Sequence, residues 1–423
     1  MKGSEVIASA LTECAETFYA VPGYPVTEIA GILCAEQVIN EKVALEYALG
    51  DSLSGKRSAV ILKNVGLNAC ADPLINATTQ GLVSGVVVVA GDDCTALGSQ
   101  NTEDSRFFGE LAQVPVLEPG HQTCARAVAA AFEASEQFSR VALIRVTPPI
   151  LEGETNDATL CHRRGTGRLA SSDLTMRGRA QAAERVLASM HNWSQNSPLN
   201  QLRGGIVATG PEEGDSHVVT VYPPPAGASV LNNTRELGRP FLFEHRCLKG
   251  SDELPVPETY HERGFYRTFC RGCPFKSLLN ILSEKGITVI CDIGCALLAS
   301  NPPFRIGRAG YALGSSVAVA ARSTKIALIG DYALMHSGVN ALIDVYEKRL
   351  PLLTIVLKND RMGMTGGQPA PDLLKYIAWA EPEVCPADDV SFLNDELKVP
   401  DEPRTLVVTG TCPEGCSHET VEC

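Results

Sequence analysis

Apolar positions between residues 326 and 368 follow a strand, helix, strand pattern. Residues 326–329 are a continuous apolar run that ends at Gly330 and Asp331. Residues 352–357 are a second run, apolar except for Thr354, which ends just before Asn359. Between the two runs, apolar side chains recur at helical spacing, at Met335, Val339, Leu342, Ile343 and Tyr346. The pattern predicts a right-handed βαβ unit whose two strands are parallel neighbours.

Polar side chains stand where each of these strands ends. Open α/β sheets bind ligands at the carboxyl edge of their strands, so we expect Asp331 and Asn359 to emerge together there. A carboxylate, an amide oxygen and a backbone carbonyl, here that of Arg361, suit Mg²⁺, whose shell is completed by phosphates and water. Gly330 lets the chain approach a diphosphate closely. The alternative is that Asp331 only caps the next helix and Asn359 only lies in a turn.

A similar alternation extends over residues 1–150. Strand-like apolar runs are found at 58–62, 85–90, 114–117 and 141–146. Helical patterns are found at 3–19, 27–36, 41–53, 66–81 and 122–137. Strands separated by helices predict an α/β domain with a doubly wound, mostly parallel sheet.

The middle of the chain has a different character. Residues 151–268 contain a helical pattern at 174–189 and short strand-like runs at 204–210, 217–222 and 239–246. We interpret this region as a linker with a reduced middle domain. The alternating pattern resumes at residue 269, so we expect two α/β domains, at 1–150 and 269–423.

Composition narrows the class of protein. A length of 423 residues agrees with two or three domains, and a net charge of −13 argues against nucleic acid or an anionic membrane as the main partner. The N-terminal segment has helical spacing and no long apolar run, so we expect neither a signal peptide nor a membrane anchor, and a cytoplasmic protein. The 15 cysteines are spread through predicted strands and helices, which favours buried, reduced thiols.

A second candidate site lies at the start of the predicted helix 41–53. Glu41 opens this helix, with Ala44 and Ala48 on its buried face. The Gly-Asp and Asn spacing described above resembles the diphosphate motif of thiamine-diphosphate (ThDP) enzymes, and this helix resembles their catalytic-glutamate helix. The resemblance implies that Glu41 hydrogen-bonds the aminopyrimidine ring and favours deprotonation of the thiazolium carbon. Without it, Glu41 is explained by the helix dipole, and Glu46 is a rival carboxylate that points elsewhere.

A series of separated segments makes the resemblance more specific. They occur in order at Lys63–Pro73, Ser99–Arg106, Pro115–Pro119, Ser197–Asn200, Cys270–Pro274, Asp292–Cys295 and Met364–Gln368. The series resembles the α subunit of indolepyruvate ferredoxin oxidoreductases, within the ThDP-dependent 2-oxoacid:ferredoxin oxidoreductase superfamily. The resemblance implies a pyrimidine-binding domain at 1–150, a diphosphate-binding domain at 269–423, and a cofactor held where domains of these two kinds meet, in one chain or across a homodimer or hetero-oligomer.

Further roles can be assigned to single residues. We expect cofactor contacts at Gly66, Asn68, Gly330, Met335, His336, Gly363 and Thr365. Gly66 and Asn68 follow a predicted strand, where backbone must approach a ligand, although a purely structural role explains them equally well. Arg106 is expected to bind a substrate carboxylate, and the alternative is a surface ion pair with Glu103 or Asp104. For His336 the alternative is a structural histidine.

Two groups of cysteines require separate interpretation. Cys270 and Cys273 have the spacing of half a zinc or iron-sulfur site, without a second pair at the usual distance. Because the resembling family carries the same segment, we favour a structural or cofactor-adjacent role over metal binding. The tail cysteines, Cys412, Cys416 and Cys423, form either a metal site or the frayed end of the domain, and we favour the latter.

The chain also departs from the family. The related α subunits continue into a ferredoxin-like domain, but this sequence has no C-x2-C-x2-C-x3-C-P run, so we expect a separate ferredoxin-like iron-sulfur partner. The middle region is abbreviated. Tyr24 stands before Pro25, where the superfamily usually has a threonine associated with the substrate's carboxyl end, so we expect Tyr24 to contact the substrate.

Three functions remain open from the sequence. The first is the ThDP-binding α-type subunit of a 2-oxoacid oxidoreductase, with a β-type subunit and a separate electron-accepting protein as partners. The second is a non-oxidative ThDP-dependent decarboxylase or lyase, which needs no iron-sulfur clusters. The third is a non-catalytic regulatory subunit with the same fold.

Overall fold

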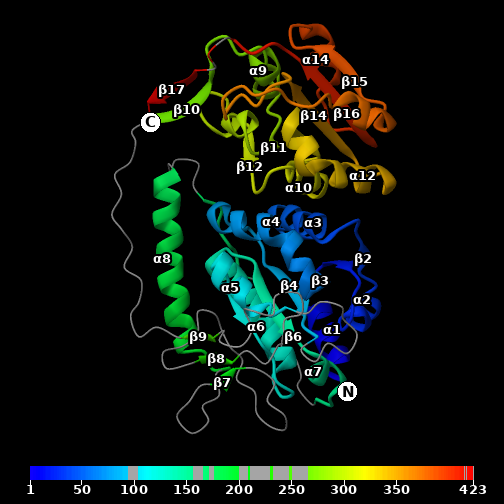
Figure 1. Ribbon diagram of the computed structural model, residues 1–423, viewed down its shortest axis with the longest axis vertical. Coiled ribbons are helices and arrows are strands. Elements are labelled where there is room, and N and C mark those ends of the chain that lie inside the picture. Colours follow the sequence, from blue (N-terminus) through cyan, green and yellow to red (C-terminus); the bar gives the residue numbers. More distant parts are fainter. Residues whose placement is uncertain are drawn as a thin grey trace. The chain divides into compact units, whose positions relative to one another are not determined.

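The computed structural model describes residues 1–93, 103–155, 165–170, 176–199, 208–209, 229–231, 247–249, 265–413, 415 and 417–422 (Figure 1). The chain divides into two compact units. Unit 1 is Met1–Ala170 with Arg179–Tyr260, and unit 2 is Ser171–Gly178 with His261–Cys423. Each unit is described by itself.

Unit 1 is built on a six-stranded sheet of order β2-β1-β3-β4-β6-β5. All neighbouring pairs are parallel. The strands are β1 (Thr17–Val21), β2 (Glu36–Gln37), β3 (Ser58–Lys63), β4 (Val86–Gly91), β5 (Val116–Leu117) and β6 (Ala142–Val146). The helices are α1 (Gly3–Cys14), α2 (Thr27–Ile32), α3 (Glu41–Leu53), α4 (Leu67–Gln80), α5 (Arg106–Ala112), α6 (Cys124–Phe138) and α7 (Pro148–Glu152), with a 3₁₀ turn, η1 (Asn64–Gly66), before α4.

Helices cover both faces of this sheet. Residues of α1, α2 and α6, such as Ile7, Ile29 and Phe132, share one core cluster with alternate residues of the strands. The strand residues between them, such as Val60 and Val88, are fully buried as well, and α3 contacts β1, β3 and β4. Because side chains alternate across a strand, burial on both faces makes these strands continuous apolar runs. The predicted doubly wound α/β fold is confirmed for this unit.

Some predicted element boundaries in unit 1 are wrong. The helix predicted at 3–19 ends at Cys14, because Thr17–Val21 pairs with Ser58–Leu62 as a strand. The helix predicted at 27–36 ends at Ile32, and Cys34 then takes the left-handed φ of 47° that turns the chain into β2.

The middle region contains a longer helix than expected. Helix α8 (Met176–Gln195) replaces the helix predicted at 174–189. It continues through Trp193, whose ring packs edge-to-face on Phe138 at 5.4 Å, so tertiary packing outweighs the polar local sequence. Short strands β7 (Ala208–Thr209), β8 (Ser229–Leu231) and β9 (Cys247–Lys249) form a small sheet. The strands predicted at 217–222 and 239–246 lie outside the described residues, as does most of the one at 204–210.

Unit 2 has a second six-stranded parallel sheet, of order β12-β11-β13-β14-β16-β15. Its strands are β11 (Val289–Cys291), β12 (Gly307–Ala309), β13 (Ile326–Gly330), β14 (Leu352–Lys358), β15 (Glu383–Pro386) and β16 (Pro403–Thr409). Its helices are α9 (Lys276–Glu284), η3 (Cys295–Ser300), α10 (Ser316–Arg322), α11 (Asp331–Ala333), η4 (Leu334–Gly338), α12 (Val339–Glu347), α13 (Leu374–Ile377), η5 (Ala378–Ala380) and α14 (Val390–Glu396). Two further strands, β10 (Phe265–Cys270) and β17 (His418–Glu422), form an antiparallel pair. In the sequence, β10 precedes the strands of the parallel sheet and β17 follows them.

The βαβ unit predicted at 326–368 is present in unit 2. Strands β13 and β14 are parallel neighbours, with Ile326 opposite Leu353 and Gly330 opposite Leu357. Helices α9 and α14 pack on one face of the sheet, and α10 contacts both β13 and α12. The helical segment between the two strands is not uniform, because η4 is one turn of π-helix. Such turns are frequent at functional sites.

Asp292, at the end of β11, is a fully buried carboxylate held by backbone groups. It accepts N–H groups of Ile293, Gly314 and Ser316 at 2.9, 2.8 and 3.0 Å. Burial raises the pKa of Asp292 to about 6, although these backbone hydrogen bonds oppose that shift.

The Asp292→Asn variant is expected to reveal this carboxylate through the pH dependence of stability. A raised folded-state pKa favours the folded state below about pH 4, and this contribution, up to about 3 kcal/mol, is lost as pH rises through about 6. Asparagine keeps only one of the two oxygens that accept the three N–H groups, so the variant is less stable than the wild type, and its deficit should be larger at pH 4.5 than at pH 7.5. Denaturant unfolding across this range measures the difference, with the exposed Asp388→Asn as control. A deficit that grows with pH would contradict the assignment.

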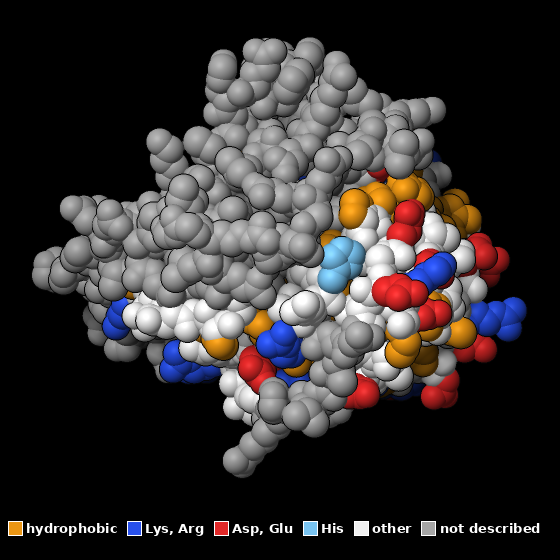
Figure 2. Space-filling view, turned by 90° about the horizontal axis from the view of Figure 1, so that it is seen from below, with side chains coloured by type: hydrophobic (Ala, Val, Ile, Leu, Met, Phe, Trp, Pro, Cys, Tyr) orange, Lys and Arg blue, Asp and Glu red, His pale blue; other side chains and the backbone are white. Residues whose placement is uncertain are grey.

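Surface character agrees with the acidic composition. Figure 2 shows one face, on which Asp and Glu side chains lie among Lys, Arg and hydrophobic side chains and no continuous basic patch is visible among the coloured residues. Within the described residues, no helix is both long enough and apolar enough to cross a membrane.

Candidate functional site

Asp331 and Asn359 meet at the carboxyl edge of the sheet in unit 2. The buried Asp331 carboxylate follows β13, and its Oδ2 accepts the N–H groups of Asn359 and Asp360, which follow β14, at 3.1 and 2.9 Å. Its Oδ1 accepts the N–H of Tyr332 at 2.7 Å. Burial raises the pKa of Asp331, and these hydrogen bonds to the ionised form oppose the shift. The structure also agrees in part with the alternative roles of a helix cap and a turn residue, since Asp331 begins α11 and Asn359 lies in the turn after β14.

The side chain of Asn359 is held from both ends. Its Oδ1 accepts the N–H of Arg361 at 3.2 Å, and its Nδ2 donates to the Sγ of Cys412 at 3.0 Å. The Cys412 contact was not foreseen, because nothing in the local sequence relates residue 412 to the turn after β14. The donor set of one carboxylate, one amide oxygen and nearby carbonyls is of the oxygen-rich kind that Mg²⁺ prefers. Gly330 has open space where a side chain would project.

These residues line a cavity of about 680 Å³ in unit 2. Gly330, Asp331, Asn359, Arg361, Gly363 and Thr365 all contribute to its wall. Much of the remaining wall is apolar, with Phe269, Phe275 and Leu298 among its residues. Met335 and His336 do not line this cavity: they lie in the π-helical turn η4, where His336 is exposed. Six predicted residues of unit 2 are therefore gathered around one cavity and two are not.

The cavity wall also contains thiols. Cys270, Cys273, Cys295 and Cys412 line it together with His418, and the Sγ of Cys295 lies 3.6 Å from the Nε2 of His418. Burial, with Cys412 and Cys270 nearby, raises the pKa of Cys273 to about 11. We expected Cys412 to belong to a frayed end of the domain, but it packs in the cavity wall. Cys416 and Cys423 lie outside the described residues. Among the residues that the structure places, no three His, Cys, Asp or Glu side chains are arranged to hold a metal ion.

Glu41 lies in the first turn of α3 in unit 1. The side chain of Asn40 caps this helix by accepting the N–H of Val43 at 2.9 Å. Ala44 and Ala48 are fully buried, as expected, and so is nearly every residue of α3 from Val43 onward. The helix is covered on several sides because it contacts the strands and α4. The rival carboxylate, Glu46, is buried and paired with Lys42 at 2.9 Å, whereas Glu41 is half-buried.

Gly66 packs directly on the side chain of Glu41. A Cβ at residue 66 would lie 2.6 Å from the Cγ and 2.8 Å from the Oε1 of Glu41. The φ of Gly66 is −67°, so glycine is required by close approach and not by backbone conformation. Gly66 was expected on a loop, and it lies instead at the end of the 3₁₀ turn η1, where a glutamate side chain is what approaches it.

Replacing Gly66 by alanine is expected to displace the Glu41 carboxyl while leaving the fold intact. The new methyl group occupies the space of the Glu41 side chain, and if Glu41 has its predicted catalytic role, a displacement of about 1 Å lowers turnover by about 10- to 100-fold. Steady-state kinetics and a thermal melt measure the two effects. Gly31→Ala in α2 is the matched control, since nothing lies within 4 Å of its Cβ position. Turnover within about twofold of the wild type in Gly66→Ala would contradict the contact.

Two other predicted residues of unit 1, Asn68 and Tyr24, have different surroundings. The Nδ2 of Asn68 donates to the Glu103 carboxylate at 2.9 and 3.1 Å. Tyr24 is 36% exposed and precedes Pro25 through a cis peptide bond. Burial, with Glu152 and Asp93 nearby, raises the pKa of Tyr24. Pro25 lies against Gly91 at the end of β4, so Tyr24 is near the carboxyl edge of this sheet.

Arg106 does not lie where it was expected. Its guanidinium is 2% exposed and pairs with Asp104 at 2.6 Å and Glu118 at 3.4 Å. The alternative ion pair with Asp104 is therefore present, but it is buried and not at the surface. A fully desolvated guanidinium between two carboxylates is already engaged, so a substrate role for Arg106 is not carried further.

Comparison with known proteins identifies what the chain resembles. Residues 298–387 match the family model described as "Thiamine pyrophosphate enzyme, C-terminal TPP binding domain", and this span contains Asp331, Asn359 and Arg361. The chain is 28% identical to the indolepyruvate oxidoreductase subunit IorA of Methanothermobacter marburgensis, over 83% of this chain and 73% of that protein. It is 26% identical to IorA of Archaeoglobus fulgidus, over 87% and 76%.

A solved structure shows the same fold. The thiamine diphosphate-dependent 4-hydroxybenzoylformate decarboxylase of Rhodococcus jostii RHA1 superposes with a TM-score of 0.59 and 16% identity, over 98% of this chain and 100% of that one. At this identity the likeness concerns the fold alone. Together, these comparisons confirm the resemblance to the indolepyruvate oxidoreductase α-type subunits and the fold of ThDP-dependent enzymes.

Proposed function

We propose, from the premise that this chain is an IorA-like subunit of the ThDP-dependent oxidoreductases, that it binds ThDP with Mg²⁺ and decarboxylates an indolepyruvate-like 2-oxoacid. The observation that carries the proposal is the pairing of Asp331 with the turn at Asn359 in the wall of the cavity, inside the span that matches the TPP-binding family model. Gly363 and Thr365 line the same cavity and are assigned to cofactor contacts.

The residues of unit 2 would hold the diphosphate end of the cofactor. The Asp331 carboxylate, the Asn359 amide oxygen and the Arg361 backbone carbonyl would hold Mg²⁺, and the diphosphate and water would supply its other ligands. Phe269, Phe275 and Leu298 make the neighbouring wall apolar, which excludes water from a bound cofactor. Gly330 leaves room for a diphosphate to approach the end of β13.

Glu41 of unit 1 is the proposed catalytic residue. Its carboxyl, set against Gly66 at the start of α3, would hydrogen-bond a ring nitrogen of the aminopyrimidine and hold the proton that is passed between them. When bound, ThDP supplies the electron sink that lets a 2-oxoacid lose carbon dioxide. Tyr24, at the carboxyl edge of the same sheet, is assigned to the substrate.

Oxidative decarboxylation releases two electrons, so the reaction requires an acceptor. We assign this role to a separate ferredoxin-like iron-sulfur protein and expect a β-type oxidoreductase subunit as the other partner. The proteins that this chain resembles are named as subunits of indolepyruvate oxidoreductase, which supports an assembly with other chains. We place the assembly in the cytoplasm, as a homodimer or hetero-oligomer.

Two measurements test the proposal. Calorimetric titration of the purified chain with ThDP is expected to show binding that depends on Mg²⁺. An anaerobic assay with aryl and short-chain 2-oxoacids, with and without a redox dye, is expected to release carbon dioxide only when the dye can accept electrons. Carbon dioxide release without the dye would instead identify a non-oxidative decarboxylase. Failure to bind ThDP would leave the non-catalytic alternative.

A further inference from the structure

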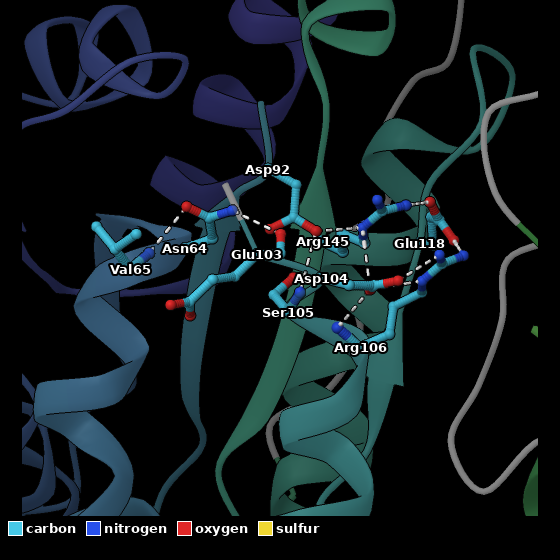
Figure 3. Close-up of polar contacts among 9 residues, drawn as sticks. All are labelled: Asn64, Val65, Asp92, Glu103, Asp104, Ser105, Arg106, Glu118 and Arg145. Carbon is cyan, nitrogen blue, oxygen red and sulfur yellow. Dashed lines mark hydrogen bonds and ion pairs between the residues drawn. The ribbon is translucent and has the colours of Figure 1, made fainter. Parts of the chain in front are cut away.

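Five ionisable side chains are buried together in unit 1. They are Asp92, Asp104, Arg106, Glu118 and Arg145, and none is more than 2% exposed (Figure 3). Arg145 pairs with Asp92 and Glu118, and Arg106 pairs with Asp104 and Glu118. We refer to this group as the ion cluster. It joins the carboxyl ends of β4 and β5 and the strand β6 to the start of α5.

Stability alone is a weak explanation for the ion cluster. Two guanidinium groups face three carboxylates, and desolvation of buried charges offsets much of their attraction. Burial raises the pKa of Asp92 to about 6 even though it is paired with Arg145. A buried ionic group does, however, fix the geometry of the groups that it contacts.

The ion cluster holds the backbone that leads into α5. The N–H of Ser105 donates to the Asp92 carboxylate at 3.1 Å, and the N–H of Arg106 donates to the Asp104 carboxylate at the same distance. These two hydrogen bonds fix the backbone just after Glu103, which precedes Asp104, and so fix the position of Glu103. Figure 3 shows this segment between the ion cluster and the start of α4.

Glu103 in turn contacts both ends of the segment 64–68. Its backbone carbonyl accepts the Nδ2 of the fully buried Asn64 at 2.6 Å, and its carboxylate accepts the Nδ2 of Asn68. The Oδ1 of Asn64 accepts the N–H of Val65 at 2.8 Å, which shapes the turn η1. The turn is thus hydrogen-bonded to Glu103 through the side chain of Asn64.

The turn η1 ends on the Glu41 side chain. Gly66 is its last residue, and a Cβ there would lie within 2.8 Å of the Glu41 carboxyl. One turn further along α4, the Sγ of Cys70 donates to the backbone carbonyl of Glu41 at 3.2 Å. The start of α4 therefore touches Glu41 through both its side chain and its backbone.

We propose that the ion cluster is a positioning device for Glu41, which acts through Glu103 and Asn64 on the turn that carries Gly66. Asn64 is the positioning residue that joins Glu103 to this turn. The inference rests on the proposed function only for the role of Glu41 in turnover. That the ion cluster fixes the turn η1 does not depend on the proposed function.

Asn64→Asp separates the two hydrogen bonds of this residue. An aspartate retains an oxygen for the N–H of Val65 but has no donor for the Glu103 carbonyl. Hydrogen–deuterium exchange on the cofactor-free chain is expected to be faster at residues 64–68 in this variant. Asp92→Asn should show the same effect, because it weakens the hold on Ser105. Asn76→Asp, at a later position in α4, is the control and should not change exchange at 64–68. Unchanged exchange at 64–68 in both Asn64→Asp and Asp92→Asn would overturn the proposal.

Kinetics connect the turn with Glu41. With cofactor bound, Asn64→Asp is expected to lower kcat by about 10- to 100-fold with little change in KM. In the Glu41→Gln background the same change should have almost no further effect, since residues that act as a unit are non-additive. An equal loss in both backgrounds would overturn the connection to Glu41. If the wild type neither binds ThDP nor turns over, the proposed function fails, and the exchange experiment still decides whether the ion cluster fixes the turn.

Discussion

Glu41→Gln is expected to lower the rate of 2-oxoacid decarboxylation by about 10²- to 10⁴-fold, while ThDP and Mg²⁺ binding stay within a few-fold of the wild type. Glutamine preserves the size of the side chain and its contact with Gly66. It cannot take up and return a proton at Oε1, so the hydrogen bond to the aminopyrimidine loses its acid-base function. The cap by Asn40 does not involve the Glu41 side chain, so α3 should remain folded.

Single-turnover and steady-state rates with saturating cofactor measure this loss, and calorimetric titration measures cofactor affinity. Glu28→Gln is a matched control, because Glu28 also lies in the first turn of a helix of unit 1 but contacts Lys2 and Ser4 near the surface. It should leave turnover unchanged. Turnover by Glu41→Gln equal to that of the wild type would exclude Glu41 as the catalytic acid-base group.

Local patterns in the sequence were sufficient to predict the βαβ unit at 326–368 and the start of helix α3. A fully buried parallel strand is a continuous apolar run whatever its neighbours, so β13 and β14 could be placed to within a residue. Asp331 and Asn359 meet because both follow neighbouring parallel strands, which topology alone ensures. The helix predicted at 41–53 coincides with α3 at both ends.

Contacts between distant segments could not be predicted. Asp92 lies 53 residues before Arg145, so no local spacing indicates that Arg106 belongs to a buried ion cluster rather than to a substrate site. Strand β1 was merged into the preceding helix because only its pairing with β3 distinguishes it. The approach of Cys412 to Asn359 depends on the chain returning to the cavity after β16, 53 residues later. The polar residues at the ends of strands could therefore be predicted from the sequence, but the side chains from distant segments that contact them could not.

Asp331→Asn is expected to weaken ThDP binding in the presence of Mg²⁺ by at least about 100-fold. The substitution removes the one carboxylate among the proposed Mg²⁺ ligands, and an amide compensates the charge of a divalent cation poorly. Because asparagine keeps one oxygen, part of the hydrogen bonding to Asn359 and Asp360 is retained, and the loop after β14 should keep its conformation. Calorimetric titration with ThDP at several Mg²⁺ concentrations separates a loss of metal affinity from a loss of diphosphate contacts.

Asp360→Asn provides the control for this change. Asp360 is adjacent to Asn359, but its side chain is 61% exposed and pairs with Lys358 on the surface. Its replacement changes the local charge by the same amount without altering a proposed ligand. If Asp331→Asn and Asp360→Asn weakened binding equally, a general electrostatic effect would account for both, and Asp331 would not be a metal ligand. A loss confined to Asp331→Asn, and relieved in part by excess Mg²⁺, places the ion at the junction of β13 and β14.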